Sequence, residues 1–331
     1  MTLPTVGPLP AAAMVAAAVR ALVGRRRDVE VVAAALAAGR SVLLEGPPGT
    51  GKTTLLRALA DGAGVGLVLV EGNAELSPAR LIGHHDPSRV LSEGYRHDTF
   101  VPGPLLDAMS SGSILYVEEL NRVPEETLNV LLGVLSERRM QVPRYGEVIA
   151  APTFRLVAAM NPYDAVGTGR VTPALYDRTC RVAVGYQDEP EEREIVARQA
   201  PGSQQLVSRA VRAVRLTRDH ADLRIGSSVR GAIDVVAVAT ELALLRRTAP
   251  NEDPSAGDRW DDEVGRDAAV TALSGRITLR EGVNRTPEEV VEEIWRRAAA
   301  VVSEVGEPDP SEGKARGPDR PRAARAAPTT P

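Results

Sequence analysis

An eight-residue glycine-rich segment constrains the fold of this chain more than any other feature. Gly46-Pro47-Pro48-Gly49-Thr50-Gly51-Lys52-Thr53 has the pattern G-x-x-x-x-G-K-T. It follows the apolar run 41–45 and precedes the helical pattern 55–60. This order of strand, loop and helix predicts a phosphate-binding loop, in which backbone N–H groups and a helix N-terminus surround an anionic phosphate. In that arrangement Lys52 reaches the β- and γ-phosphates and the Thr53 hydroxyl can ligate Mg²⁺.

The basic residues support this interpretation. Only two lysines occur among the 331 residues, Lys52 and Lys314, and the remaining basic side chains are arginines. A compact ammonium on a flexible stem suits a phosphate at this position better than a planar guanidinium. The sequence therefore predicts that the chain binds a nucleoside triphosphate.

Composition limits the other possibilities. With 43% hydrophobic residues the chain can bury a large core, and a net charge of −4 gives no general attraction to nucleic acid or anionic membranes. The apolar segment 11–23 is too short to span a bilayer, contains Arg20 and lacks the basic flank of a signal peptide. A single cysteine, Cys180, fits a reducing compartment. We therefore expect a cytoplasmic protein without membrane association.

The pattern of apolar runs predicts an α/β fold. After a loose N-terminus (1–10) we expect two helices over 11–22 and 27–38, packed beside the nucleotide site. Five mostly apolar runs are typical of strands covered on both faces: 41–45, 66–71, 113–118, 154–160 and 181–184. Helical patterns separate most of them, which favours a doubly wound parallel sheet over 11–186.

Two segments interrupt this alternation. The polar stretch 83–100 is too long for a plain connection and is a candidate functional insert. Residues 140–149 form two short strand patterns around a Pro/Gly turn, which predicts a hairpin.

Beyond about residue 187 the strand signal disappears. Helices are predicted over 190–199, 204–218, 228–247, 258–272 and 286–302. Thr286-Pro287-Glu288-Glu289 is a typical helix start. We expect a small all-α domain over 187–302, followed by a disordered tail over 303–331 that has six prolines and few large apolar residues.

A pair of carboxylates narrows the chemistry. The strand 114–117 delivers Glu118 and Glu119 to its C-terminal end, where open α/β sheets place their ligands. One carboxylate can hold Mg²⁺ and the next can polarise the water that attacks the γ-phosphate. A solvated strand end is the alternative, but after a phosphate-binding loop the pair is typical of a Walker B motif.

At this point the sequence resembles the AAA+ ATPases, and within them the MoxR-like branch of the helix-2-insert clade. The segments that carry the resemblance occur in the family's order and extend over about residues 20–300: 43–53, Phe100-Val101-Pro102-Gly103-Pro104-Leu105, Glu118-Glu119-Leu120-Asn121-Arg122, Met160-Asn161-Pro162, Ala174-Leu175-Tyr176-Asp177-Arg178 and Gly226-Ser227-Ser228-Val229-Arg230.

The resemblance implies roles for individual residues. Glu119 is implied as the catalytic base, Asn161 as sensor 1, Arg178 as an arginine finger acting on a neighbouring subunit, and Arg230 as sensor 2. Thr53 and Glu118 would hold Mg²⁺. The nucleotide-binding set would be Gly46, Pro47, Pro48, Gly49, Thr50, Gly51, Lys52, Thr53, Thr54 and Arg230. Arg122 is regularly placed but has no assigned role, and the segments around 84–100 and 140–149 would face a central pore.

One residue departs from the family's pattern, because Glu118 stands where Asp is usual. The added methylene extends the carboxylate by about 1.5 Å, which matters for octahedral Mg²⁺ geometry. Either the strand end is set back or hydrolysis is slow.

The resemblance further implies an ATP- and Mg²⁺-dependent homo-oligomer, expected to be a hexameric ring. Such a ring would remodel a client protein or load a cofactor or metal into it, with a von Willebrand A domain protein as a possible partner. Three alternatives remain open: a magnesium-chelatase-type motor subunit, a DNA-dependent motor disfavoured by the acidic balance, and a nucleotide switch without turnover.

Other conspicuous residues have simpler interpretations. We expect His84, His85 and His97 to be surface or pore-loop residues rather than a metal cluster. Arg25-Arg26-Arg27 is interpreted as a solvated helix start, and Trp260 and Trp295 as core or interface residues. Cys180 is expected to be a small buried residue.

Overall fold

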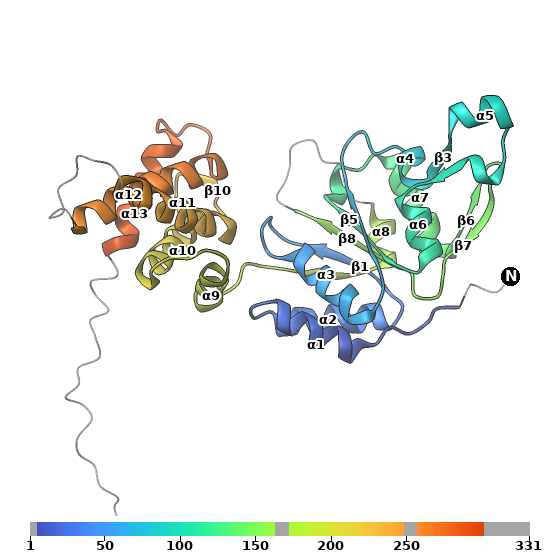
Figure 1. Ribbon diagram of the computed structural model, residues 1–331, viewed down its shortest axis with the longest axis horizontal. Helices are drawn as coiled ribbons and strands as arrows, with labels where there is room; N and C mark the ends of the chain where they lie inside the picture. The colour runs from blue at the N-terminus through green and yellow to red at the C-terminus, as the bar shows by residue number, and fades with distance from the viewer. Residues whose placement is uncertain (1–4, 163–171, 248–256, 301–331) are drawn as a thin grey trace, which may run out of the picture.

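A five-stranded parallel sheet forms the centre of the α/β part of the molecule (Figure 1). The structure is a computed structural model that describes residues 5–162, 172–247 and 257–300. The strand order is β2-β5-β8-β1-β9, and every neighbouring pair is parallel. The strands are β1 (Ser41–Glu45), β2 (Leu67–Glu71), β5 (Ile114–Glu118), β8 (Arg155–Met160) and β9 (Thr179–Ala183). The predicted doubly wound parallel sheet is confirmed.

Helices cover both faces of this sheet, because successive side chains of a strand point in opposite directions. Leu43, Leu115 and Val117 enter one core with α4 (Pro78–Ile82), α6 (Pro104–Ser111) and α7 (Glu125–Glu137). Val42, Leu44 and Tyr116 enter the other with α1 (Ala11–Ala21), α2 (Arg26–Ala37) and α3 (Lys52–Ala63). The apolar runs of the three inner strands β1, β5 and β8 are therefore buried on both sides.

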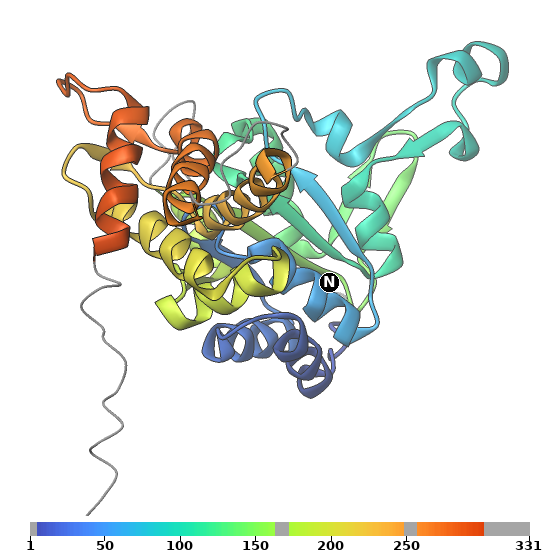
Figure 2. The same cartoon turned by 60° about the vertical axis from the view of Figure 1, so that its left-hand side comes forward.

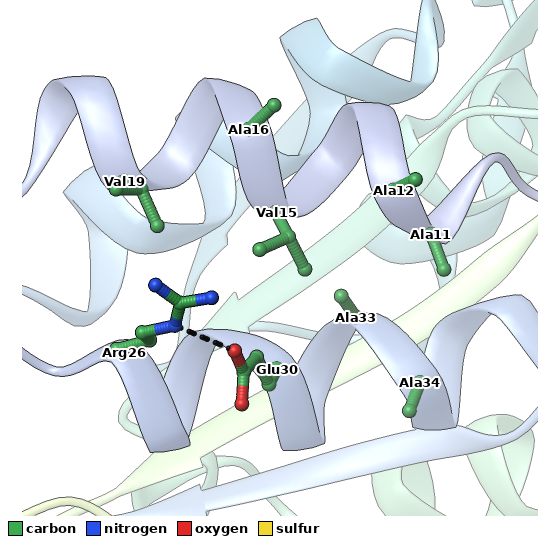
Figure 3. A pocket seen from close by; sticks show the side chains of 9 residues that line it. All are labelled: Ala11, Ala12, Val15, Ala16, Val19, Arg26, Glu30, Ala33 and Ala34. Atoms are coloured by element: carbon green, nitrogen blue, oxygen red, sulfur yellow. Dashed lines mark hydrogen bonds and ion pairs between the residues drawn. The ribbon is translucent and has the colours of Figure 1, made fainter.

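The two N-terminal helices were predicted, and their small side chains allow close packing. Figure 3 shows Val15 of α1 and Ala33 of α2 pointing toward each other, with an ion pair between Arg26 and Glu30 at one end. The shallow groove between these helices contains no residue of the phosphate-binding loop.

Strand β9 lies at the sheet edge and corrects one expectation. It pairs only with β1, so three of its side chains, Cys180, Arg181 and Ala183, are exposed. The prediction that Cys180 is buried was wrong, because a strand at the edge is not covered by a second neighbour.

The insert and the hairpin project together from the α/β part, as Figures 1 and 2 both show. The insert contains β3 (Gly83–His85), α5 (Pro87–Glu93), the 3₁₀ turn η1 (His97–Thr99) and β4 (Phe100–Pro102), and β3 pairs with β4 in antiparallel fashion. The predicted hairpin is present as β6 (Arg139–Val142) and β7 (Gly146–Ile149). The two are joined by aromatic contacts, with ring centroids 4.0 Å apart for His97 and Tyr145 and 4.5 Å for Phe100 and Tyr145.

In the described residues beyond the sheet, five helices share a separate core that includes the buried Trp295. They are α9 (Glu189–Gln199), α10 (Gln204–Asp219), α11 (Val229–Arg247), α12 (Gly257–Leu273) and α13 (Pro287–Ala300), with the 3₁₀ turn η3 (Ser274–Arg276). The predicted start of the last helix is confirmed, because Thr286 and Glu289 exchange hydrogen bonds between side chain and backbone N–H at 2.9 and 3.2 Å.

The expectation that strands end with the sheet was wrong. Strands β10 (Leu223–Ile225) and β11 (Thr278–Leu279) form an antiparallel pair within the helical part. Strands of two or three residues are too short to show a period-2 pattern.

Some expectations fall outside the described residues: the first part of the loose N-terminus, the tail over 303–331 and the side chain of Trp260. Within the part of the chain that the structure describes, no helix has the length and apolar character needed to cross a bilayer. The cytoplasmic location stays a prediction.

Candidate nucleotide-binding site

The candidate site lies at the C-terminal edge of the sheet. Strand β1 ends at Glu45, directly before Gly46, and lies in register with the end of β8 (Glu45 opposite Met160). Strand β5 ends at Glu118, and Asn161 follows β8 directly. Because these three strands are parallel neighbours, the phosphate-binding loop, the acidic pair and Asn161 meet at one edge.

Two glycines of the loop are required by close approaches. A Cβ at Gly46 would lie 2.0 Å from the carbonyl oxygen of Val184. Gly49 has a φ of +73°, and a Cβ there would lie 2.2 Å from Ser228 Oγ in the helical part. A side chain at either position would force the surrounding backbone or Ser228 to move. The loop is thus closely bounded by the end of β9 and by the start of α11.

Lys52 begins helix α3, and its side chain is buried within the loop. Its Nζ donates to the carbonyl oxygens of Gly46 (3.0 Å) and Pro47 (2.9 Å). Burial lowers the pKa of Lys52, the charge of Glu118 opposes that shift, and Arg25 and Arg230 lower the pKa further. Three cationic side chains, Lys52, Arg25 and Arg230, therefore lie near one another at this loop.

The second half of the motif contacts the acidic strand end. Thr53 Oγ1 donates to Glu118 Oε1 at 3.2 Å. Two neighbouring ligands of an octahedral Mg²⁺ at about 2.1 Å are separated by about 3 Å, so this oxygen pair fits such an ion. The longer side chain of Glu118 therefore reaches the position at which a shorter acid would be expected.

The Tyr116 hydroxyl is buried beside this pair. Burial, together with the charge of Glu118, raises the pKa of Tyr116. The phenol therefore stays neutral and adds no charge beneath Thr53 and Glu118.

Glu119 has an unusual backbone. Its φ of 51° and ψ of 44° lie in the left-handed region, which is uncommon for residues other than glycine, asparagine and aspartate. The 3₁₀ turn η2 (Leu120–Arg122) follows immediately, and Glu119 Oε2 lies 3.1 Å from Arg122 Nη1. The turn ends β5 abruptly and gives Glu119 a different direction from Glu118. Strained backbone of this kind is concentrated at functional sites.

The other predicted residues are distributed around this edge. The backbone oxygen of Asn161 accepts from Asn121 Nδ2 at 3.4 Å, which links the ends of β8 and η2. Thr50 Oγ1 donates to the Pro47 carbonyl at 3.1 Å inside the loop. Pro48 and Thr54 are exposed.

The two predicted arginines lie in different surroundings. Arg230 Cδ lies 3.8 Å from the position that a Gly49 Cβ would occupy, so this residue is beside the loop of its own chain. Arg178 ends α8 (Pro173–Arg178) and donates to Ser136 Oγ (2.7 Å) and the Ala174 carbonyl (2.9 Å). These partners lie on α7 and α8 rather than on the loop.

Sequence reasoning missed Arg25. It was expected to be solvated, but its φ of 57° before α2 turns the side chain toward the segment between sheet and helices. There it donates to the Gly185 carbonyl and to Gln187 Oε1 (3.1 Å), and it also contacts Asp28. No local pattern signals this tertiary contact. Among the described residues, no group of three or more His, Cys, Asp or Glu side chains could hold a metal ion. The interpretation of the histidines stays a prediction.

The fold and the motif geometry define a P-loop nucleotide-binding protein of AAA type. The model of the AAA domain, dynein-related subfamily, matches residues 41–179. An uncharacterized protein of Staphylococcus epidermidis is 30% identical over 241 residues, which cover 71% of this chain and 89% of that protein. An uncharacterized protein of Staphylococcus aureus is 36% identical over 163 residues, with coverage of 49% and 61%.

Among solved structures, a protein from Cytophaga hutchinsonii described as a candidate ATPase is similar at a TM-score of 0.46 and 20% identity, over 86% of this chain and 92% of that one. The chain belongs to the AAA family, in its dynein-related subfamily.

Proposed function

We propose that this AAA-family ATPase is a Mg²⁺-dependent ATP hydrolase of the MoxR-like branch. It acts as a homo-oligomeric ring, expected to be hexameric, that remodels or activates a client protein. One observation carries the hydrolytic part of the proposal: the Thr53 hydroxyl and the Glu118 carboxylate lie 3.2 Å apart beside the buried Lys52. The loop that would bind the phosphates and the strand end that would hold the metal are therefore already in contact.

Each residue then has a definite task. Backbone N–H groups of 49–53 and the Lys52 ammonium would bind the phosphate oxygens, and Thr53 and Glu118 would hold the magnesium ion. Mg²⁺ supplies positive charge that offsets the charge developing on the phosphate oxygens. Glu119, aimed away from Glu118 by its left-handed backbone, accepts the proton of the attacking water, and Asn161 orients that water.

The position of Arg178 supports the proposed ring. This arginine is held on α7 and α8 of its own chain, whereas Arg230 is the arginine found beside the loop. An arginine that stabilises the transferring phosphoryl group from a neighbouring subunit is consistent with this separation. The site of one subunit is then complete only when a second subunit is bound.

The client role rests on the resemblance to the MoxR-like branch, with a von Willebrand A domain protein as the expected partner and nucleic acid and membranes as unlikely ones. The insert around α5 and the hairpin β6–β7 would contact the client.

Two variants test the hydrolytic proposal. Lys52→Ala removes a charge-assisted contact to the phosphates and should weaken ATP binding by at least about tenfold in calorimetry. Glu119→Gln should bind ATP as tightly as the parent but lose turnover by about 10² or more, as measured by phosphate release at saturating Mg²⁺.

Arg27→Ala, on the exposed side of α2, is a suitable control and should change neither quantity. Unchanged affinity in Lys52→Ala would contradict the assigned loop, and full activity in Glu119→Gln would contradict the assigned base. Capture of proteins on Glu119→Gln with ATP, followed by mass spectrometry, would identify the client.

A further inference from the structure

Glu45 is a buried carboxylate that the proposed chemistry does not use. It ends β1 directly before Gly46 and is 5% exposed, whereas the preceding residues 42–44 are fully buried and apolar. An apolar residue would complete this strand without the cost of burying a charge. The presence of a carboxylate here therefore points to a specific contact.

That contact joins β1 to α8, the helix that carries Arg178. Tyr176 Oη donates to Glu45 Oε1 at 2.8 Å, and Arg181 Nε donates to Glu45 Oε2 at 2.5 Å. Each oxygen of the carboxylate thus has a donor, one from α8 and one from β9. Burial and the bond to Glu45 raise the pKa of Tyr176, so the phenol remains a donor at neutral pH.

We infer that Glu45 is a positioning residue for Arg178: through Tyr176 it fixes the arginine-bearing helix to the strand that ends in the phosphate-binding loop. This inference rests on the proposed action of Arg178 on a neighbouring subunit. It goes beyond the proposed function by linking two parts of the same subunit: its phosphate-binding loop and the Arg178 that acts on the next subunit.

The geometry explains why this contact matters more than general packing. Helix α8 is only six residues long, and Tyr176 and Arg178 are both partly exposed. Its C-terminal end continues into β9, which pairs with β1, and its side chains contact the rest of the domain through the buried Leu175, the Tyr176–Glu45 bond and the Arg178–Ser136 bond. If Arg178 leaves Ser136 to reach another subunit, the junction with β9, Leu175 and Tyr176 remain to hold the helix. Without the Tyr176 hydroxyl, the polar contact between α8 and β1 is lost.

The connection to the loop is equally short. Gly46 follows Glu45, its backbone N–H donates to the Met160 carbonyl and its carbonyl accepts from Lys52. The position of Gly46 therefore fixes the Glu45 carboxylate and, through Tyr176, the direction of helix α8.

Tyr176→Phe tests this directly because it removes one hydroxyl and keeps the ring. We expect kcat to fall by about tenfold, while the ATP dissociation constant and the melting temperature stay within about twofold and 2 °C of the parent. Glu45→Gln should act in the same direction, and the double variant should be no slower than the slower single variant. Tyr145→Phe, which removes a hydroxyl from the hairpin, is the matched control and should leave kcat unchanged.

Mixed rings show in which subunit the hydroxyl acts. Arg178→Ala subunits keep an intact loop, and Lys52→Ala subunits keep an intact arginine, so mixing them should restore activity at the shared interfaces. Adding Tyr176→Phe to the Lys52→Ala partner should abolish most of that rescue. Adding it to the Arg178→Ala partner should leave the rescue intact.

The outcomes distinguish failure of the proposed role of Arg178 between subunits from failure of the inference about Glu45. If the basic mixture restores nothing while subunits exchange, the proposed action of Arg178 between subunits is wrong and the inference falls with it. If the basic mixture is active but Tyr176→Phe is harmless in the Lys52→Ala partner, or acts through the Arg178→Ala partner, only the inference about Glu45 is overturned.

Discussion

At the scale of single residues, several charged side chains are buried, and their polar partners offset the cost of that burial. Lys52, Glu45 and Arg155 are all less than 10% exposed, and each is held by specific polar contacts. Arg155 begins β8, at the N-terminal end of the parallel strands, whereas the phosphate-binding loop lies at their C-terminal end. Its guanidinium donates to four backbone carbonyls, those of Leu36, Pro152, Phe154 and Gly7. This residue therefore ties the N-terminal segment and α2 to the central sheet.

Replacing Arg155 should test that structural role. Arg155→Met fills a similar volume but leaves several buried carbonyl oxygens without donors, which should lower the free energy of unfolding by about 3–5 kcal/mol. Urea denaturation would measure this loss. The matched variant Arg27→Met, at an exposed arginine of α2, should change stability by less than about 0.5 kcal/mol. Equal stability of the two variants would show that the carbonyls are satisfied in another way.

Glu118 allows a second test at this scale, because the sign of the effect separates two explanations. Its carboxylate already reaches the Thr53 hydroxyl, so Glu118→Asp should withdraw the oxygen by about 1.5 Å and lower the ATPase rate by about tenfold or more. If Glu118 merely impairs the site, the shorter acid should raise the rate. Steady-state assays at saturating Mg²⁺ and high protein concentration decide between these outcomes. A tenfold increase would indicate a slow switch rather than a working motor.

At the scale of elements, the sequence predicted the strands and strand-end residues that have a local pattern, and it did not predict contacts between distant segments. Strands β1, β5 and β8 were found because strands buried on both faces appear as short apolar runs. The edge strand β2 was found because it is also an apolar run, although Leu69 is exposed. Strand β9 was expected over 181–184 but spans Thr179–Ala183, since an edge strand with exposed side chains has a weaker pattern. The residues at the strand ends were found from their motifs. The contacts of Arg25 and the Glu45–Tyr176 bond were not, because they join segments more than 100 residues apart.

The insert and the hairpin form the most distinctive pair of elements. Tyr145 of the hairpin contacts both His97 and Phe100, and Arg144 lies 3.7 Å above the ring of Tyr95. The polar composition of 83–100 does not indicate these contacts. A few aromatic side chains hold an insert that is otherwise exposed. We therefore expect the insert and the hairpin to behave as one unit.

Tyr145→Ala should uncouple them. Each aromatic pair contributes about 0.5–1.5 kcal/mol beyond simple burial, so amide hydrogen exchange over 84–100 should accelerate by roughly tenfold. ATP binding should not change, because none of these rings contacts the phosphate-binding loop in the described contacts. Tyr145→Phe keeps the ring and should behave like the parent. Equal exchange rates in Tyr145→Ala and the parent would mean that the insert is held by its own strands alone.

At the scale of the whole molecule, the nucleotide site joins the sheet and the helical part. Gly49 approaches Ser228, Arg230 lies beside the loop, and Arg25 reaches from α2 to the segment that connects the two parts. Any ligand in the loop would therefore contact both parts at once. This arrangement allows binding of a nucleotide to change how firmly the helical part is held against the sheet.

Arg230 provides the test of this coupling. Its guanidinium lowers the pKa of Lys52, which indicates that the two charges repel each other across the loop. A polyphosphate bound between Lys52 and Arg230 would attract both side chains and offset their mutual repulsion. Arg230→Ala should therefore weaken ATP binding by about tenfold, equivalent to about 1.4 kcal/mol, and weaken ADP binding less because ADP carries less charge. Calorimetry with both nucleotides in the Glu119→Gln background would measure this without hydrolysis. Arg224→Ala removes an exposed arginine of β10 and should leave both affinities unchanged. If Arg230→Ala also leaves them unchanged, the helical part does not sense the phosphates through this residue, and its contact with Gly49 serves only packing.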